Sequence, residues 1–281
     1  NSLTKNQYAD ASQNLPSAET IFMLNALSEE LNVLRQTMLF SGLEVVAHNI
    51  RRQQKNLALF EFGNTYHKTN KGFDEKDHLT LFLSGEHLAE NWLEKNRPVQ
   101  FHDLAQTVYQ ILNKFGVQDV NSHDVKEDYF AYGLLLEHKQ KALVSMGKVH
   151  PKFSGLCQVQ QEVFYAEIDW AYLKELLSLD VTAQTISKFP MVRRDLSLVI
   201  NKSVKFEEIK KVAFQGATRL LQDLRVFDVY EGEKIGSEEK AYAISFFLQD
   251  EHQTLTDKII DKTMRTLMRT FEEKVGAKIR Q

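Results

Sequence analysis

The chain has 281 residues, a formal net charge of −3, 43% hydrophobic residues and 26% charged residues. These values are typical of a globular protein long enough for two domains, and they exclude a strongly basic, free-standing nucleic-acid binder. No apolar run approaches the roughly 20 residues of a membrane span. The single cysteine, Cys157, excludes an internal disulfide, and we expect a buried thiol in a cytoplasmic protein. The start at Asn1, without a signal peptide, suggests a fragment of a longer chain.

The charge is unevenly distributed along the chain. Residues 188–281 carry 18 Lys and Arg against 15 Asp and Glu, a net charge of +3, which leaves −6 for the rest. A charge of +3 fits a modest RNA contact made within a larger assembly.

The first half predicts few helices and many strands. Residues 1–20 predict a short helix and a loop, 21–24 a short strand, and 27–35 a loop. Apolar residues at three- and four-residue intervals predict an amphipathic helix over 41–54. Residues 57–66 follow as a strand, and a polar loop is expected over 68–77.

Further strands and two helices are expected between residue 78 and a linker at 178–188. Strands are expected over 78–84, 118–126, 129–137, 141–149 and 163–169, with helices over 101–115 and 170–177. Successive strands with few helices between them indicate an antiparallel sheet. We therefore predict a first domain over 1–177, a linker over 178–188 and a second domain over 189–281.

The second domain begins with Phe189-Pro190, an extended pair that leads into alternating apolar and polar residues up to Ile200. A helix, two strands, a second helix ending at Gly276 and a short strand follow. This βαββαβ order is the ferredoxin-like arrangement, in which both helices cover one face of the sheet. The chain is thus predicted to be an α+β protein.

Alternation along each strand predicts which side chains reach the uncovered face of this sheet. Phe227 and Val229 are expected to point to the helices. The outward set is Asp195, Ser197, Val199, Val226, Asp228, Tyr230, Ala241, Ala243, Ser245, Lys278 and Arg280. A small, polar face with an aromatic ring and a basic edge suits unstacked single-stranded bases, although the pattern alone also fits a solvated sheet face.

Several motifs in this domain resemble a known family. They are Phe-Pro-x-x-Arg-Arg-Asp-Leu at 189–196, Val-Phe-Asp-Val-Tyr at 226–230, Phe-x-Leu-Gln-Asp at 246–250 and Thr-Leu-Thr-Asp at 254–257. Together they resemble the ferredoxin-fold anticodon-binding (FDX-ACB) domain of bacterial phenylalanyl-tRNA synthetase β subunits. The resemblance implies that Asp228 and Tyr230 meet the first anticodon base and that Arg280 also reaches the anticodon. Asp195, Ser197, Ala241 and Lys278 are further candidates for RNA contact.

The first half is similar to the catalytic-like module of the same family, a class II synthetase core without its chemistry. The motifs are Asn25-Ala26-Leu27-Ser28, Leu-Arg-Gln-Thr-Met-Leu at 34–39, Asn49-x-x-Arg52-Gln53 and Leu-Phe-Glu-Phe-Gly at 59–63. The resemblance implies that the helix 41–54 and the strand after it contact the α subunit. One departure is visible, since Phe40-Ser41-Gly42 stands where relatives have a Pro-Gly pair.

No catalytic set is visible in this half. A working class II site needs an ATP-binding arginine and a later Gly-x-Gly-x-x-Arg, because those cations stabilise a phosphorane-like centre. Here the corresponding strand reads Tyr66-His67-Lys68, and no Gly-x-Gly-x-x-Arg occurs. We assign no catalytic residue, no metal ligand and no cofactor to this chain, interpret Glu61 as a structural carboxylate, and expect the isolated chain to be inactive.

The resemblance therefore implies a subunit of phenylalanine–tRNA ligase, which attaches phenylalanine to tRNA-Phe with ATP and Mg²⁺ as an α2β2 assembly. This chain would supply contacts to the α subunit and anticodon recognition. One alternative is a free-standing single-stranded RNA-binding module, and another is an independent enzyme using the first half. The silent synthetase-like half argues against the former, and the missing ATP-binding set against the latter.

Overall fold

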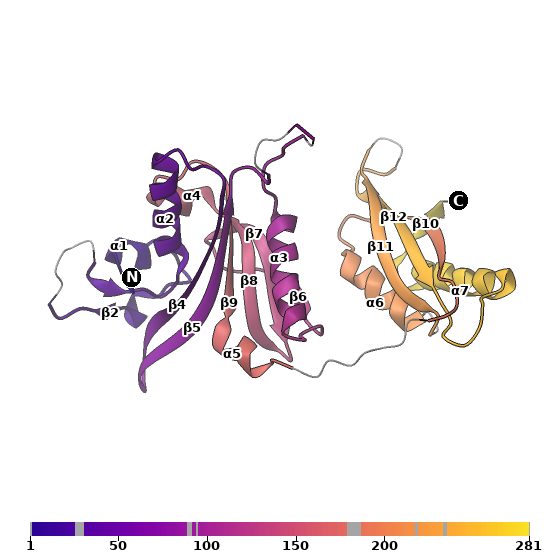
Figure 1. The fold of residues 1–281 in the computed structure, drawn as a ribbon, viewed down its shortest axis with the longest axis horizontal. Coiled ribbons are helices and arrows are strands. Elements are labelled where there is room, and N and C mark those ends of the chain that lie inside the picture. The colour runs from indigo at the N-terminus through magenta and orange to yellow at the C-terminus, as the bar shows by residue number, and fades with distance from the viewer. Residues whose placement is uncertain are drawn as a thin grey trace. The chain divides into compact units, whose positions relative to one another are not determined.

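The computed structural model describes residues 2–25, 31–88, 92–93, 95–178, 187–216, 219–232 and 235–280, without the side chains of Ala9 and Arg280. The chain forms two compact units, Asn1–Val181 and Thr182–Gln281 (Figure 1). The division falls inside the predicted linker 178–188, most of which lies outside the described residues. No helix in the described ranges is long and apolar enough to cross a membrane.

The first unit is built on a six-stranded antiparallel sheet. Its strand order is β4-β5-β9-β8-β7-β6. The strands are β4 (Leu57–Thr69), β5 (Gly72–Ser84), β6 (Asn121–Asp124), β7 (Phe130–His138), β8 (Lys141–Val149) and β9 (Val163–Asp169). The helices are α2 (Leu39–Arg51), α3 (Phe101–Lys114), α4 (Pro151–Leu156) and α5 (Trp170–Glu175).

A small N-terminal lobe completes this unit. It consists of β1 (Leu3–Thr4), α1 (Asn6–Ala9), the 3₁₀ helix η1 (Ser17–Glu19), β2 (Ile21–Phe22) and β3 (Val33–Leu34). These three strands form a second sheet in the order β1-β3-β2.

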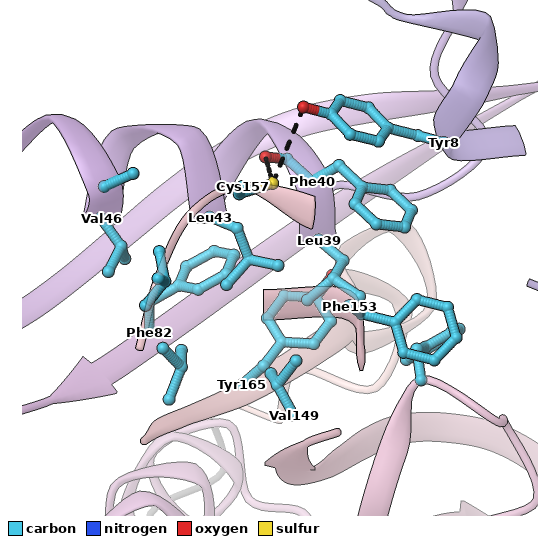
Figure 2. Close-up of a cluster of buried hydrophobic side chains, with 14 of the residues drawn as sticks. Tyr8, Leu39, Phe40, Leu43, Val46, Phe82, Val149, Phe153, Cys157 and Tyr165 are labelled. Atoms are coloured by element: carbon cyan, nitrogen blue, oxygen red, sulfur yellow. Dashed lines mark hydrogen bonds between the residues drawn. The ribbon is translucent and has the colours of Figure 1, made fainter. Parts of the chain in front are cut away.

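Each face of the large sheet has its own core. On one face, Leu39, Leu43 and Val46 of α2 pack with Phe82 and Tyr165 of the sheet, all of them buried. Figure 2 shows these side chains together with Phe153 of α4 and with Tyr8, which stacks on Phe40. On the other face, Leu104, Val108 and Leu112 of α3 pack against the sheet. The two helix layers therefore enclose the sheet through alternating side chains.

Cys157 lies in the first of these cores and is 5% exposed, so the expected burial of its thiol is confirmed. Burial raises the pKa of the Cys157 thiol to about 11. Its Sγ–H lies 3.7 Å from the Tyr8 hydroxyl oxygen and 4.0 Å from the Phe40 carbonyl oxygen (Figure 2). A thiol that is buried and protonated at neutral pH is a poor nucleophile.

Two expectations for this unit are wrong, and one helix was not expected. The polar loop over 68–77 is instead the end of a hairpin, because β4 and β5 pair along their whole length from Leu57↔Ser84 to Thr69↔Gly72. The expected loop over 27–35 contains β3, while residues 26–30 lie outside the described part. The turn at Pro151 continues into α4, which the sequence analysis did not foresee.

The second unit has the βαββαβ order that the sequence predicts. Its elements are β10 (Val192–Asn201), α6 (Phe206–Gly216), β11 (Leu221–Tyr230), β12 (Glu239–Leu248), α7 (Asp257–Val275) and β13 (Lys278–Arg280). The sheet order is β11-β12-β10-β13. Ile209 of α6 and Ile260, Leu267 and Phe271 of α7 pack against one face of this sheet. Gly276, with φ of +63°, ends α7 as expected.

A glycine in α2 allows this helix to approach the sheet closely. A Cβ at Gly42 would lie 2.0 Å from Cζ of Phe82, whose ring is 2% exposed. We predict that Gly42→Ala lowers the free energy of unfolding by about 1–3 kcal/mol, because overpacking a buried ring outweighs alanine's better helix propensity. Urea unfolding followed by circular dichroism measures this difference.

Gly155→Ala is the matched control, since Gly155 is helical in α4 and a Cβ there meets nothing within 4 Å. The control should match or exceed the stability of the unaltered chain. Equal stability of both variants would contradict the close approach of α2 to Phe82.

Candidate nucleic-acid interface

The face of the second sheet that α6 and α7 leave uncovered is called the open face here. The register of β10, β11 and β12 defines it, since Asp195 lies opposite Ser245, and Ser197 opposite Ala243. Its members are Arg193, Asp195, Ser197, Val199, Arg225, Phe227, Asp228, Tyr230, Ala241, Ala243, Ser245, Phe247, Lys278 and, by register alone, Arg280.

Strand β11 contains a β-bulge between Val226 and Asp228. Val226 lies opposite Ile244 and Asp228 opposite the next residue of β12, Ala243, so Phe227 is an extra residue. A bulge of this kind changes the alternation of side chains by one position. Val226 accordingly packs against the helix-side core, whereas Phe227 is 56% exposed. The expected orientations of Val226 and Phe227 are therefore both wrong.

Asp228 and Tyr230 lie on the open face, as their positions in the sequence predicted. They pair with Ala243 and Ala241, whose small side chains leave space above the sheet. Tyr230 is 39% exposed. A Cβ at Gly232 would lie 2.5 Å from the Tyr230 hydroxyl oxygen, so this glycine leaves room for the ring. Phe227, Asp228 and Tyr230 thus present two rings and a carboxylate along one strand.

Arg193 links two parts of the open face. Its guanidinium donates hydrogen bonds of 2.8 and 3.0 Å to both carboxylate oxygens of Asp195. The same guanidinium lies 5.5 Å from the centre of the Phe227 ring, within range of a cation–π interaction. Arg193, and then the Ser245 hydroxyl, hold the pKa of the Asp195 carboxyl below its usual value. Asp195 is therefore an ionised group in a fixed orientation.

The remaining candidates differ in accessibility. Ser197 is half-buried, whereas Ala241 lies on the open face but is only 7% exposed, so its side chain offers little surface to a ligand. Lys278 is exposed and its Nζ lies 2.7 Å from the Glu239 carboxylate. The backbone of Arg280 pairs opposite Ser197, but its side chain lies outside the described residues.

The sequence analysis missed Phe227, Arg193 and Phe247 as members of this face. Phe247 is half-buried beneath the Arg225 guanidinium, which lies 4.9 Å from its ring centre. Phe247 could have been predicted, because it follows the inward-facing Phe246 in β12 and alternation places its side chain on the other face of the sheet. The bulge that exposes Phe227 has no comparable signal, because no glycine marks it.

In the first unit, Arg35, Glu61 and His67 surround the part of β4 for which the sequence analysis sought a class II ATP site. Arg35 is 3% exposed, and its guanidinium donates to the Glu61 carboxylate at 3.1 Å and to the Asn64 carbonyl at 2.9 Å. This contact fits the structural role expected for Glu61. His67 Nδ1 lies 3.1 Å from the Glu19 carboxylate. Within the described ranges, no group of three His, Cys, Asp or Glu residues could hold a metal ion.

Strand β4 at the edge of the large sheet exposes a second aromatic group. Phe60 and Phe62 are 70% and 53% exposed and form an edge-to-face pair with ring centres 6.1 Å apart. Phe62 also contacts Trp170, with 4.8 Å between ring centres. Only β5 pairs with β4 among the described strands. Natural edge strands are usually protected by charges or prolines, so exposed rings here indicate a contact surface.

Comparison with known proteins agrees with this geometry. A family described as "Phenylalanyl tRNA synthetase beta chain CLM domain" matches residues 1–170. The chain belongs to this phenylalanyl-tRNA synthetase β-chain family. A second family, "Ferredoxin-fold anticodon binding domain", matches residues 187–280. The resemblance inferred from the sequence motifs is thereby confirmed.

Three curated relatives are named phenylalanine–tRNA ligase β subunit. Those of Bacteroides fragilis and Bacteroides thetaiotaomicron are 39% and 40% identical, and that of Porphyromonas gingivalis is 33% identical. Each match covers 100% of this chain but 36% of the relative. The chain thus spans just over a third of the length of the β-chain proteins that it matches.

One solved structure, the pyrrolysyl-tRNA synthetase of Desulfitobacterium hafniense, aligns with a TM-score of 0.46 at 14% identity. That alignment covers 63% of this chain and 60% of the solved one. So low a score supports no conclusion about the fold of this chain.

Proposed function

We propose that the chain works within a phenylalanine–tRNA ligase and reads the anticodon of tRNA-Phe through the open face. The observation that carries the proposal is the run Phe227, Asp228 and Tyr230 on β11, with two exposed rings on either side of an exposed carboxylate. Single-stranded bases stack on such rings, while a carboxylate accepts hydrogen bonds from base edges. The 187–280 match to an anticodon-binding family supports this use of the face.

The first unit would then serve as a class II synthetase-like scaffold without chemistry of its own. In this proposal the α subunit of an α2β2 assembly in the cytoplasm binds ATP and Mg²⁺ and forms the aminoacyl bond. The sequence of β4 supports this division, because Tyr66-His67-Lys68 stands where a class II enzyme needs its ATP-binding arginine. The contact of Arg35 with Glu61 further occupies a carboxylate that could otherwise act as a base.

The α-subunit contact is best placed on β4. The helix predicted for this role, α2, exposes a single large apolar side chain, Val45 at 45%, while its other apolar residues are buried or, for Ile50, partly buried. Strand β4, by contrast, offers Phe60 and Phe62 on an edge with no further strand among the described residues. Exposed aromatic rings of this kind are typical centres of protein interfaces.

The stacking role of Tyr230 can be tested in the assembled ligase. We predict that Tyr230→Ala lowers kcat/KM for charging tRNA-Phe by roughly five- to a hundred-fold, since a stacked base contributes about 1–3 kcal/mol. ATP–pyrophosphate exchange should stay unchanged. Phe214→Ala on α6 removes a ring that is similarly exposed in the same unit, and should leave charging intact. Unchanged charging by Tyr230→Ala would indicate a merely solvated sheet face.

Asp228 should determine which bases are accepted. The quantity compared is the ratio of kcat/KM for tRNA-Phe to kcat/KM for a tRNA with an altered first anticodon base. We predict that Asp228→Asn lowers this ratio by about ten-fold or more. The reason is that the amide also donates a hydrogen bond, whereas the carboxylate only accepts. The measurement is charging of both tRNAs by both enzymes. An unaltered ratio would exclude a base contact by this carboxylate.

The α-subunit contact has its own test. Phe60→Lys should abolish stable assembly with the α chain while the variant chain keeps its thermal unfolding midpoint, because the ring is 70% exposed in the isolated chain. Co-purification and analytical ultracentrifugation measure assembly. Leu156→Lys on α4, where the side chain is 44% exposed, serves as the control and should assemble normally. Normal assembly of Phe60→Lys would place the interface elsewhere.

A further inference from the structure

Helix α7 carries a row of cations on the side turned away from the sheet. Lys258, Lys262, Arg265 and Arg269 are all exposed and follow each other at intervals of four, three and four residues. This spacing keeps all four on one face of the helix over about 16 Å. The row is separate from the open face, because α7 packs on the opposite side of the sheet (Figure 1).

The row lines a shallow hollow of about 500 Å³. Besides the four cations, its lining consists of Asp261 and Thr266, so its local net charge is +3. That value equals the net charge of all residues from 188 to 281. Arg269 has an exposed ion pair with Glu273 at 3.7 Å, a contact of little energetic weight. The other three cations have no ion pair within 4 Å in the part of the chain that the structure describes.

A larger groove of about 1200 Å³ adjoins the N-terminal half of the row. Lys258 and Lys262 line both hollows, and Arg219 is the third Lys or Arg side chain that lines the groove. Asp250 and Glu251 also line the groove and offset part of this positive charge. Attraction for an anion is therefore strongest at the middle of α7, around Lys262 and Arg265.

A further hollow joins this row to the open face. Among the described residues, β13 pairs with β10 from Ser197 to Val199, and no described strand pairs with the outer edge of β10 before that point. There a hollow of about 420 Å³ is lined by Asp195, Ser197 and Phe227 from the open face, and by Asp261, Met264 and Met268 from α7. Asp261 lines this hollow and the cationic one alike. The surface is thus continuous around the edge of β10.

We propose that the α7 row binds backbone phosphates of the same RNA whose bases lie on the open face. The inference rests on the proposed function, because it takes an RNA on the open face as given. Repeated cations without exposed rings among them suit a sugar–phosphate backbone rather than bases. The RNA would pass from the open face around the edge of β10 and continue along α7. Base recognition and backbone binding would thereby lie on opposite sides of one small domain.

The test measures binding of full tRNA-Phe, and of the isolated anticodon loop as an oligonucleotide, by the chain at several salt concentrations. Lys262→Gln with Arg265→Gln should weaken tRNA binding roughly five- to twenty-fold at low salt and reduce the slope of log K against log salt by about 2. Binding of the short loop should not change, because it ends before α7. Thermal unfolding should be unaffected, since both side chains are exposed.

The double variant Lys210→Gln with Lys211→Gln is the matched control. It removes the same charge from exposed positions of α6 that line neither cationic hollow. Equal losses in both double variants, or an unchanged salt slope in the α7 variant, would overturn the inference while leaving Tyr230-dependent binding intact. Loss of α-subunit assembly in place of RNA binding would also overturn it. No RNA binding by the unaltered chain at low salt would contradict both this inference and the proposed function.

Discussion

The extra residue that the bulge at Phe227 adds to β11 determines which side chains of this part of the strand reach the open face. Without the bulge, strict alternation would bury Phe227 and expose Val226, and β11 would offer only the ring of Tyr230 to the open face. With it, Val226 completes the core beside Ile244, while Phe227 and Asp228 both reach the outside opposite Ala243. A shift of one residue in the register of β11 therefore decides whether this strand presents one ring, or two rings on either side of a carboxylate, to the open face. The Arg193 guanidinium then lies over the newly exposed ring.

The N-terminal unit uses a buried cation for a structural purpose. Arg35 ties the segment after β3 to the start of α2 through Ser41, and to β4 through Glu61 and Asn64. Burial of a guanidinium requires partners for its donors, and these three contacts engage Nε and Nη1 of Arg35. The same residues thus hold the sheet and helix together.

Much of this architecture follows from the sequence because its elements obey simple periodicities. The helices α2, α3 and α7 have clear apolar faces, and β10 and β12 alternate strictly, so their positions and inward residues were predictable. The full length of the β4–β5 hairpin was not predictable, because its far end is polar and exposed. Strands that extend beyond the core stay hydrogen-bonded to each other, but their sequence shows no alternation of apolar residues there. Helix α4 begins at Pro151, directly after the strand expected over 141–149, and proline is common at the first position of a helix.

The candidate site was predictable to the same extent. Asp228 and Tyr230 were predicted on the correct face because the bulge precedes both of them. Their outward orientation was inferred from the apolar Val229 between them, which was expected to face the helices. Phe227 was misplaced because a bulge without glycine depends on tertiary packing. The exposure of Phe60 and Phe62 could not be predicted either, since the sequence of an apolar edge strand does not differ from that of a strand in the middle of a sheet.

The pairing of Arg193 with Asp195 has a consequence for the conditions under which the open face can work. The pKa of the Asp195 carboxyl is lowered and that of the Arg193 guanidinium is raised, so both partners stay ionised throughout the neutral range. None of the residues that define the open face is a histidine. The charges of the Arg193–Asp195 pair are consequently the same in mildly acidic and mildly alkaline surroundings. In the proposed function, this pair would add no pH dependence to RNA binding in the neutral range.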